Sequence, residues 1–180
     1  MLARIIMLYN HFNMRIFLYP LSALLCLSML SSCTEKDNLN ADQFMAGVQI
    51  KALSFNIRFD NPDDGYTSWV NRRLEAAKFL DIQDPDIIGL QEVLKNQLDY
   101  IDKRLSGYDY VGVGRDDGIA AGEFTPVFYN NDRFGLMDSG TFWLSEMPGK
   151  PSMGWDTQIN RISTYAFLKD QKTRKDILFE

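Results

Sequence analysis

Apolar and polar positions along residues 47–180 fall into short blocks, and the clearest of these blocks is residues 86–93. Four of its eight residues are apolar and the block follows a break at Pro85, which predicts a short strand buried on both faces. Because such a strand has no favourable interior place for a charge, we expect Glu92 at its carboxyl end, where open α/β sheets expose ligand-binding groups. The alternative is that Glu92 begins the next helix, since an acid near a helix N-terminus is favourable.

A second apolar strand is predicted within residues 47–57, and it also ends in a polar residue, Asn56. Two helices are predicted from apolar residues three and four positions apart, one after Ser68 and one over residues 94–105. We expect the core-facing side of the first helix to consist of Val70, Leu74, Ala77 and Leu80. Further strands are predicted at residues 108–113, 126–130, 134–144, 162–168 and 176–180.

The N-terminus has the pattern of an exported lipoprotein. A charged start is followed by an apolar run over residues 16–30, which is short for a transmembrane helix and typical of a signal peptide. The run ends in Leu-Ser-Ser-Cys, which resembles a bacterial lipobox and implies lipid attachment to the sulfur of Cys33; an ordinary secretory signal is the alternative. We therefore predict a signal peptide at 1–32, a polar lipid-anchored tether at 33–46 and a folded domain at 47–180, located in the bacterial cell envelope as an outer-membrane or periplasmic protein.

Composition narrows the classes of function. The 180 residues are enough for one domain, and the formal net charge is −5 at pH 7. An acidic surface argues against charge-driven binding to nucleic acid and is compatible with carboxylates that hold a cation. The single histidine, His11, lies in the predicted signal peptide, so the folded part has no imidazole for acid–base chemistry.

Three motifs taken together resemble the endonuclease/exonuclease/phosphatase superfamily. They are Ser-Phe-Asn-Ile-Arg at residues 54–58, Trp69 with Arg72, and Asp-Pro-Asp-Ile-Ile-Gly-Leu-Gln-Glu-Val at residues 84–93. The superfamily includes DNase I-like nucleases, deadenylases, sphingomyelinases and sugar- or inositol-phosphate phosphatases. The similarity covers about residues 48–180, and later motifs resemble a bacterial branch often found in secreted proteins. The resemblance implies an α/β (α+β) fold, the four-layered α/β/β/α sandwich of DNase I-like proteins.

The resemblance also implies a site. Glu92 matches the family's metal ligand, usually for Mg²⁺ with Mn²⁺ as an alternative, and Asn56 matches the asparagine that supports the metal and phosphate site. Glu123 matches a glutamate that pairs with the catalytic histidine. Arg115 and Arg58 are candidates for contacts with substrate phosphate, which arginine can bind through two parallel hydrogen bonds. For Arg115 the alternative is a surface ion pair with Asp116 or Asp117.

These expectations add up to a metal-dependent phosphoesterase, anchored to the membrane by lipid and acting on a phosphorylated small molecule, a nucleotide or a lipid head group. We expect a monomer that forms no stable complex with nucleic acid. The alternative is a surface lipoprotein that binds glycans or another ligand on the same fold without catalysis.

The end of the sequence falls inside the last apolar strand, at residues 176–180. We therefore expect the chain to be the N-terminal part of a longer domain; a natural C-terminal edge strand is the alternative. The family's later motifs, which supply both histidines, do not occur in this sequence, so we expect the chain on its own to be inactive. We also expect the second sheet to be absent and the apolar face of the first to stay exposed.

Overall fold

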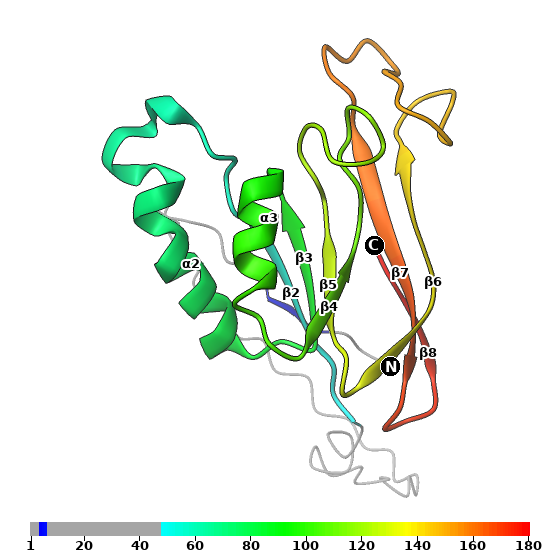
Figure 1. The fold of residues 1–180 in the computed structure, drawn as a ribbon. Coiled ribbons are helices and arrows are strands. Elements are labelled where there is room, and N and C mark those ends of the chain that lie inside the picture. The colour runs from blue at the N-terminus through cyan, green and yellow to red at the C-terminus, as the bar shows by residue number, and fades with distance from the viewer. Residues whose placement is uncertain (1–3, 7–47) are drawn as a thin grey trace, which may run out of the picture. The chain divides into compact units, whose positions relative to one another are not determined.

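The computed structural model describes the backbone of residues 4–6 and all of residues 48–180 (Figure 1). The predicted signal peptide, the tether and the lipid attachment site at Cys33 lie outside the residues described in full, so they stay predictions. Within the described part of the chain, the helices are too short or too polar to cross a bilayer.

The first sheet combines parallel and antiparallel pairing. In the described residues its order is β1 (Arg4–Ile6), β2 (Lys51–Asn56), β3 (Ile87–Gln91), β5 (Val127–Asn130) and β4 (Tyr108–Val111). Strands β1, β2 and β3 run parallel, whereas β5 is antiparallel to both of its neighbours. Asn56 pairs with Gln91, so β2 and β3 end side by side at the same edge. This register brings the polar residues that follow the two strands together.

Two helices cover one face of this sheet, α2 (Trp69–Gln83) and α3 (Lys95–Asp102), and a 3-10 helix, η1 (Pro62–Thr67), precedes α2 (Figure 1). The apolar side of α3 lies in the core as predicted, and α2 ends at Gln83, after which Asp84 adopts a left-handed conformation before Pro85. Buried residues of the two helices and the sheet form one apolar core, which includes Trp69, Leu80, Ile88, Leu90, Leu98, Ile101 and Phe128.

The predicted core face of α2 is partly wrong. Val70 and Leu74 are 61% and 42% exposed, while Ala77 and Leu80 are buried as expected. The reason is that Trp69 occupies the core position in the first turn, where its ring packs edge-on against Tyr100 with a centroid distance of 5.8 Å. The buried stripe therefore starts one residue before Val70 and turns that side chain and Leu74 toward solvent.

A second sheet packs on the other face of the first. It consists of the antiparallel strands β6 (Phe134–Trp143), β7 (Ile162–Asp170) and β8 (Asp176–Phe179), in that order. Inward-facing side chains from both sheets form a second apolar cluster: Ile87, Val127, Tyr129, Phe134, Ala166 and Leu168. The expectation that the second sheet would be absent is therefore wrong, because two successive antiparallel connections build it within residues 134–179.

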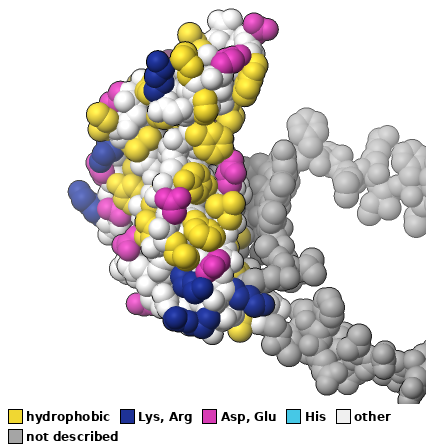
Figure 2. All heavy atoms as spheres, turned by 90° about the vertical axis from the view of Figure 1, so that its right-hand side faces the viewer, with side chains coloured by type: hydrophobic (Ala, Val, Ile, Leu, Met, Phe, Trp, Pro, Cys, Tyr) yellow, Lys and Arg dark blue, Asp and Glu magenta, His cyan; other side chains and the backbone are white. Residues whose placement is uncertain are grey.

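The layers of helices, sheet and sheet confirm the predicted DNase I-like α/β class. The outer face of the second sheet carries apolar side chains between acidic ones (Figure 2). Met137 and Leu178 on these outer strands are 52% and 64% exposed.

Candidate active site

Asn56 and Glu92 meet at the edge where β2 and β3 end. The Nδ2 of Asn56 donates a hydrogen bond of 2.8 Å to the Oε1 of Glu92, which confirms the prediction that the two side chains lie close together. Helix α3 begins only at Lys95, so the alternative that Glu92 starts a helix is wrong. Two polar side chains that are 36 residues apart in sequence thus form a pair at the open end of the sheet.

The backbone at this edge departs from strand geometry at two residues. Glu92 and Arg58 have φ angles of 59° and 58°, in the left-handed region that is costly for residues with a Cβ. After Glu92 the chain resumes pairing, because Val93 forms an antiparallel bridge with Phe124. Each of the two strands therefore ends in a sharp change of direction close to the Asn56–Glu92 pair.

Backbone amides fix both members of the pair. The N–H of Phe59 donates to Oε2 of Glu92 at 3.3 Å, and the N–H of Arg58 donates to Oδ1 of Asn56 at 2.8 Å. A carboxylate offers about four lone-pair sites, so two hydrogen bonds leave Glu92 able to accept further partners. Glu92 is half-buried and Asn56 is exposed, which keeps this remaining capacity within reach of solvent.

This donor set fits a hard divalent cation with few protein ligands. Mg²⁺ prefers oxygen ligands and keeps several waters, so one carboxylate together with substrate phosphate can hold it. Among the described residues there is no group of three or more histidine, cysteine, aspartate or glutamate side chains placed to bind a metal. The site therefore suits Mg²⁺ or Mn²⁺ held mainly by Glu92, and it lacks the closed set of ligands of a structural metal centre.

Arg58 lies next to the pair but its guanidinium is engaged elsewhere. Its Nε donates to Oδ2 of Asp64 at 2.6 Å, and a second bond joins the same two side chains. These bonds lower the pKa of Asp64, chiefly through the hydrogen bond from Arg58, and raise the pKa of Arg58. A phosphate contact by Arg58 stays a prediction, and it would compete with this ion pair.

The structure brings Arg115 and Glu123 together. Nη1 of Arg115 lies 2.8 Å from Oε2 of Glu123, and its Nε lies 3.4 Å from Asp116. Asp117 instead accepts three backbone N–H groups, first among them that of Ala121, and these lower its pKa. Of the two alternatives for an ion pair of Arg115, the one with Asp116 is present, alongside a shorter contact with Glu123.

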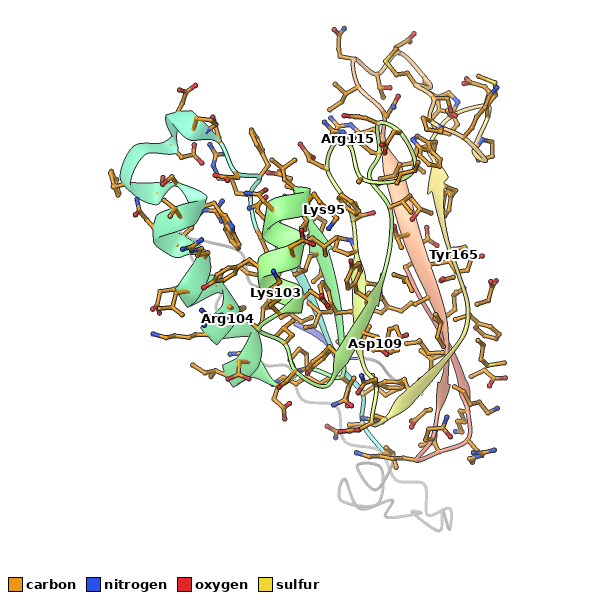
Figure 3. The ribbon with its side chains drawn as sticks, in the orientation of Figure 1. Lys95, Lys103, Arg104, Asp109, Arg115 and Tyr165 are labelled. Atoms are coloured by element: carbon orange, nitrogen blue, oxygen red, sulfur yellow. The ribbon has the colours of Figure 1, made fainter. Side chains whose placement is uncertain are left out.

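Two loops meet at Arg115, which lies at the same end of the first sheet as the start of α3 with Lys95 (Figure 3). The carbonyl of Arg115 accepts the indole N–H of Trp143 at 2.7 Å and the Nδ2 of Asn160 at 3.1 Å. Glu123 precedes Phe124, whose bridge to Val93 connects this loop to the residue after Glu92. The Arg115–Glu123 pair and the Asn56–Glu92 pair are thus joined through the backbone.

Sequence reasoning missed Gln97, which is fully buried and bonded to the chain segment beside the site. The available signal was its place on the apolar side of the predicted helix, between Leu94 and Leu98. A polar side chain at such a position requires hydrogen-bond partners in the core. The partners themselves come from residues far away in the sequence, so the pattern alone did not identify them.

Comparison with known proteins agrees with this geometry, although no family model matches the sequence. The crystal structure of an endonuclease/exonuclease/phosphatase from Bacteroides vulgatus is 44% identical, with a TM-score of 0.70, over 72% of this chain and 50% of that chain. The mannosyl-6-phosphatase of Bacteroides thetaiotaomicron is 39% identical, with a TM-score of 0.70, over 72% of this chain and 49% of that chain. An uncharacterised protein of Acanthamoeba polyphaga mimivirus is 28% identical over 140 residues, which are 72% of this chain and 52% of that protein.

The two-sheet α/β fold is that of DNase I-like proteins, and the similar solved structures include an endonuclease/exonuclease/phosphatase and a mannosyl-6-phosphatase. The chain belongs to the endonuclease/exonuclease/phosphatase superfamily, a superfamily of phosphoesterases. The chain spans about half the length of the solved structures and of the curated relative that it matches.

Proposed function

We propose that this chain supplies the metal- and phosphate-binding part of a metal-dependent phosphoesterase, in which Glu92 and Asn56 hold Mg²⁺ or Mn²⁺. The observation that carries the proposal is the 2.8 Å bond between Asn56 and a Glu92 carboxylate that still has free lone pairs. A carboxylate in a saturated buried cluster has its acceptor sites occupied by protein groups. The carboxylate of Glu92 is instead held in place by two hydrogen bonds and stays accessible to a ligand.

The residues around the pair have separate tasks in this proposal. Asn56 and the N–H of Phe59 orient the carboxylate of Glu92 before any ligand arrives. Arg115 keeps free N–H donors beyond those used by Glu123 and Asp116, and these suit phosphate oxygens. The bound cation would neutralise negative charge that develops on the phosphoryl oxygens and the leaving group.

For the substrate, we propose an exported phosphorylated small molecule, and we favour a sugar phosphate over a nucleotide or a lipid head group. The support is the 39% identity to a protein named as a mannosyl-6-phosphatase. The proposal includes a monomer in the bacterial cell envelope, anchored through lipid at Cys33 and without a stable nucleic-acid partner. A phosphomonoester and a phosphodiester both suit a site with one carboxylate-bound cation.

We expect the 180-residue chain on its own not to hydrolyse phosphate esters. Its single histidine is His11, so residues 48–180 contain no imidazole that could move a proton to the leaving group. The experiment therefore uses a chimera, in which residues 48–180 replace the matching half of the Bacteroides thetaiotaomicron mannosyl-6-phosphatase.

The chimera should release phosphate from a mannosyl-6-phosphate substrate in the presence of Mg²⁺. Replacing Glu92→Gln in it should lower kcat by at least about a hundredfold, because one anionic ligand is lost while the shape is kept. Asp138→Asn, on the outer sheet and bonded to Tyr165, serves as the control and should keep full activity. A folded chimera whose turnover is the same with Glu92→Gln would refute the assignment.

A further inference from the structure

Residues 57–60, which join β2 to η1, are held by side chains from two different helices. Arg72 of α2 donates to the carbonyls of Ile57, Arg58 and Phe59, the bond to Arg58 being 2.6 Å long. Gln97 of α3 donates through Nε2 to the carbonyl of Arg58 at 2.9 Å and accepts the N–H of Asp60 at 3.1 Å. We call these two side chains the Arg72–Gln97 clamp.

The clamp converges on a residue with an unfavourable backbone conformation. Arg58 has a φ of 58°, and its carbonyl oxygen accepts from both Arg72 and Gln97. A left-handed conformation at a residue with a Cβ persists only where surrounding contacts determine it. The two clamp side chains are themselves well placed for this task, because Gln97 is fully buried and the guanidinium of Arg72 stacks 5.1 Å from the buried ring of Trp69.

A role of Gln97 in stabilising α3 alone explains only one of its three hydrogen bonds. Its Oε1 accepts the N–H of Leu94 at 3.0 Å, which completes a helix cap for α3. Its other two bonds run to residues 37 and 39 positions away, in a segment that lies outside the helix. That segment also supplies the N–H of Arg58 to Asn56 and the N–H of Phe59 to Glu92.

We propose that Arg72 and Gln97 are positioning residues for the site, acting through residues 57–60 on Asn56 and Glu92. By fixing the peptide groups of Arg58 and Phe59, they hold the Glu92 carboxylate in the orientation that accepts a divalent cation. The proposal rests on the proposed function for its consequence, but the clamp itself is a property of the metal-free chain. Changing groups that orient metal ligands typically weakens metal binding about ten- to a hundredfold.

Three variants of the full chain separate positioning from stability. Gln97→Met keeps the length of the side chain and removes its hydrogen bonds, and Arg72→Lys keeps the charge but loses the planar fork that reaches several carbonyls. Leu98→Ala is the control, since Leu98 is fully buried next to Gln97 in α3 and its apolar side chain cannot hydrogen-bond to residues 57–60. The control removes more apolar contact than either clamp variant and should destabilise the fold by cavity formation.

Two measurements are made on each folded variant: amide hydrogen exchange of the metal-free protein by NMR, and Mn²⁺ affinity by electron paramagnetic resonance. Gln97→Met and Arg72→Lys should speed exchange of the Phe59 amide about fivefold or more, the effect of losing about 1 kcal/mol of local protection. Both should weaken Mn²⁺ binding about tenfold or more. Leu98→Ala should leave the Mn²⁺ affinity and the local exchange of Phe59 within about twofold of wild type.

Unchanged exchange of the Phe59 amide in both clamp variants would overturn the proposal, as would an equal loss of Mn²⁺ affinity in Leu98→Ala. If Gln97→Met does not fold, Arg72→Lys alone decides, because Arg72 is half-buried, whereas Gln97 is fully buried, and the replacement keeps its positive charge. Wild-type protein that binds no Mn²⁺ would refute the proposed metal site, whereas faster exchange of Phe59 in the same clamp variants would still support the clamp.

Discussion

Two carboxylates in this chain show opposite uses of hydrogen bonding. Glu92, at the open end of the first sheet, accepts one bond to each oxygen and stays half-buried. Asp170, at the end of β7, is fully buried and accepts from Arg133 at 3.2 Å, from the N–H of Lys172 at 2.9 Å and from Thr173 at 2.9 Å. The hydrogen bonds of Glu92 orient the carboxylate and leave acceptor sites for a ligand, whereas those of Asp170 use its acceptor sites to stabilise the fold.

The ion pair of Asp170 with Arg133 also connects the two sheets. Arg133 is 4% exposed and pairs with both Asp170 and Asp86, the latter at 2.6 Å. Asp86 directly precedes β3 in the first sheet, whereas Asp170 belongs to β7 in the second. A saturated buried cluster of this kind indicates a structural role, and an unsaturated pair at a strand end indicates a binding role.

The largest expected effect comes from Arg133→Met, which removes the central member of the buried cluster. It should destabilise the fold by about 3–5 kcal/mol, because it leaves two carboxylates without their cation. Urea unfolding measures the change, and Lys169→Met is the matched control, since its ion pair with Asp176 is partly exposed and should cost at most about 1 kcal/mol. Equal losses in the two variants would contradict a structural role for the cluster.

The same cluster predicts a pH dependence. Burial alone would raise the pKa of Asp170, but hydrogen bonds from Arg133, Lys172 and Thr173 outweigh it and lower the pKa from 3.8. Because the folded pKa lies below the unfolded one, the ionised carboxylate stabilises the fold above the unfolded value, and this stabilisation is lost as the pH falls through the folded pKa. Urea unfolding of the wild type from pH 7 downward should therefore lose stability below about pH 4.

Asp170→Asn should start from a lower stability at pH 7 and fall less steeply below about pH 4, because the titrating group is gone. Parallel curves for the wild type and Asp170→Asn would mean that other acids govern the acid unfolding.

At the Asn56–Glu92 pair, we expect a substitution to cost less stability than one in the Arg133 cluster and to cost more affinity for Mn²⁺. Asn56→Ala should destabilise by only about 1 kcal/mol, the net value of a typical hydrogen bond. It should weaken Mn²⁺ binding about tenfold, because Glu92 loses one of the groups that orient it. Asn71→Ala is the control, as its amide bonds only to Ser68 and Gly65 near the start of α2. A similar loss of Mn²⁺ affinity in the control would argue against an orienting role for Asn56.

The local sequence pattern was sufficient to predict the Asn56–Glu92 pair but not the buried cluster around Arg133. Asn56 and Glu92 could be predicted because each follows an apolar strand, and parallel neighbouring strands place their ends together. Arg133 lies in a turn and Asp170 at the end of a strand, and only the packing of one sheet on the other makes them buried partners. Gln97 was missed for the same reason, since its partners are supplied by a segment nearly forty residues away.

Most strands were predicted within a few residues of their bounds, because each is a separate apolar block between turn residues. The first helix was predicted but its core face was displaced, since apolar spacing could not show that Trp69 would take the core position ahead of Val70. The second sheet was not expected because the chain was taken to supply only half of the sandwich; its strands were predicted, but the apolar pattern does not show which strands pair with which.

Mn²⁺ titration of the full chain, wild type against Glu92→Gln, tests most directly whether the open carboxylate is a cation ligand. Electron paramagnetic resonance counts free Mn²⁺, and thermal unfolding of the same samples shows whether the fold is intact. We expect saturable binding of one Mn²⁺ by the wild type, at least about tenfold weaker binding by Glu92→Gln, and nearly equal melting temperatures. Asp138→Asn should bind like the wild type. Equal Mn²⁺ affinity of the wild type and Glu92→Gln would contradict the account.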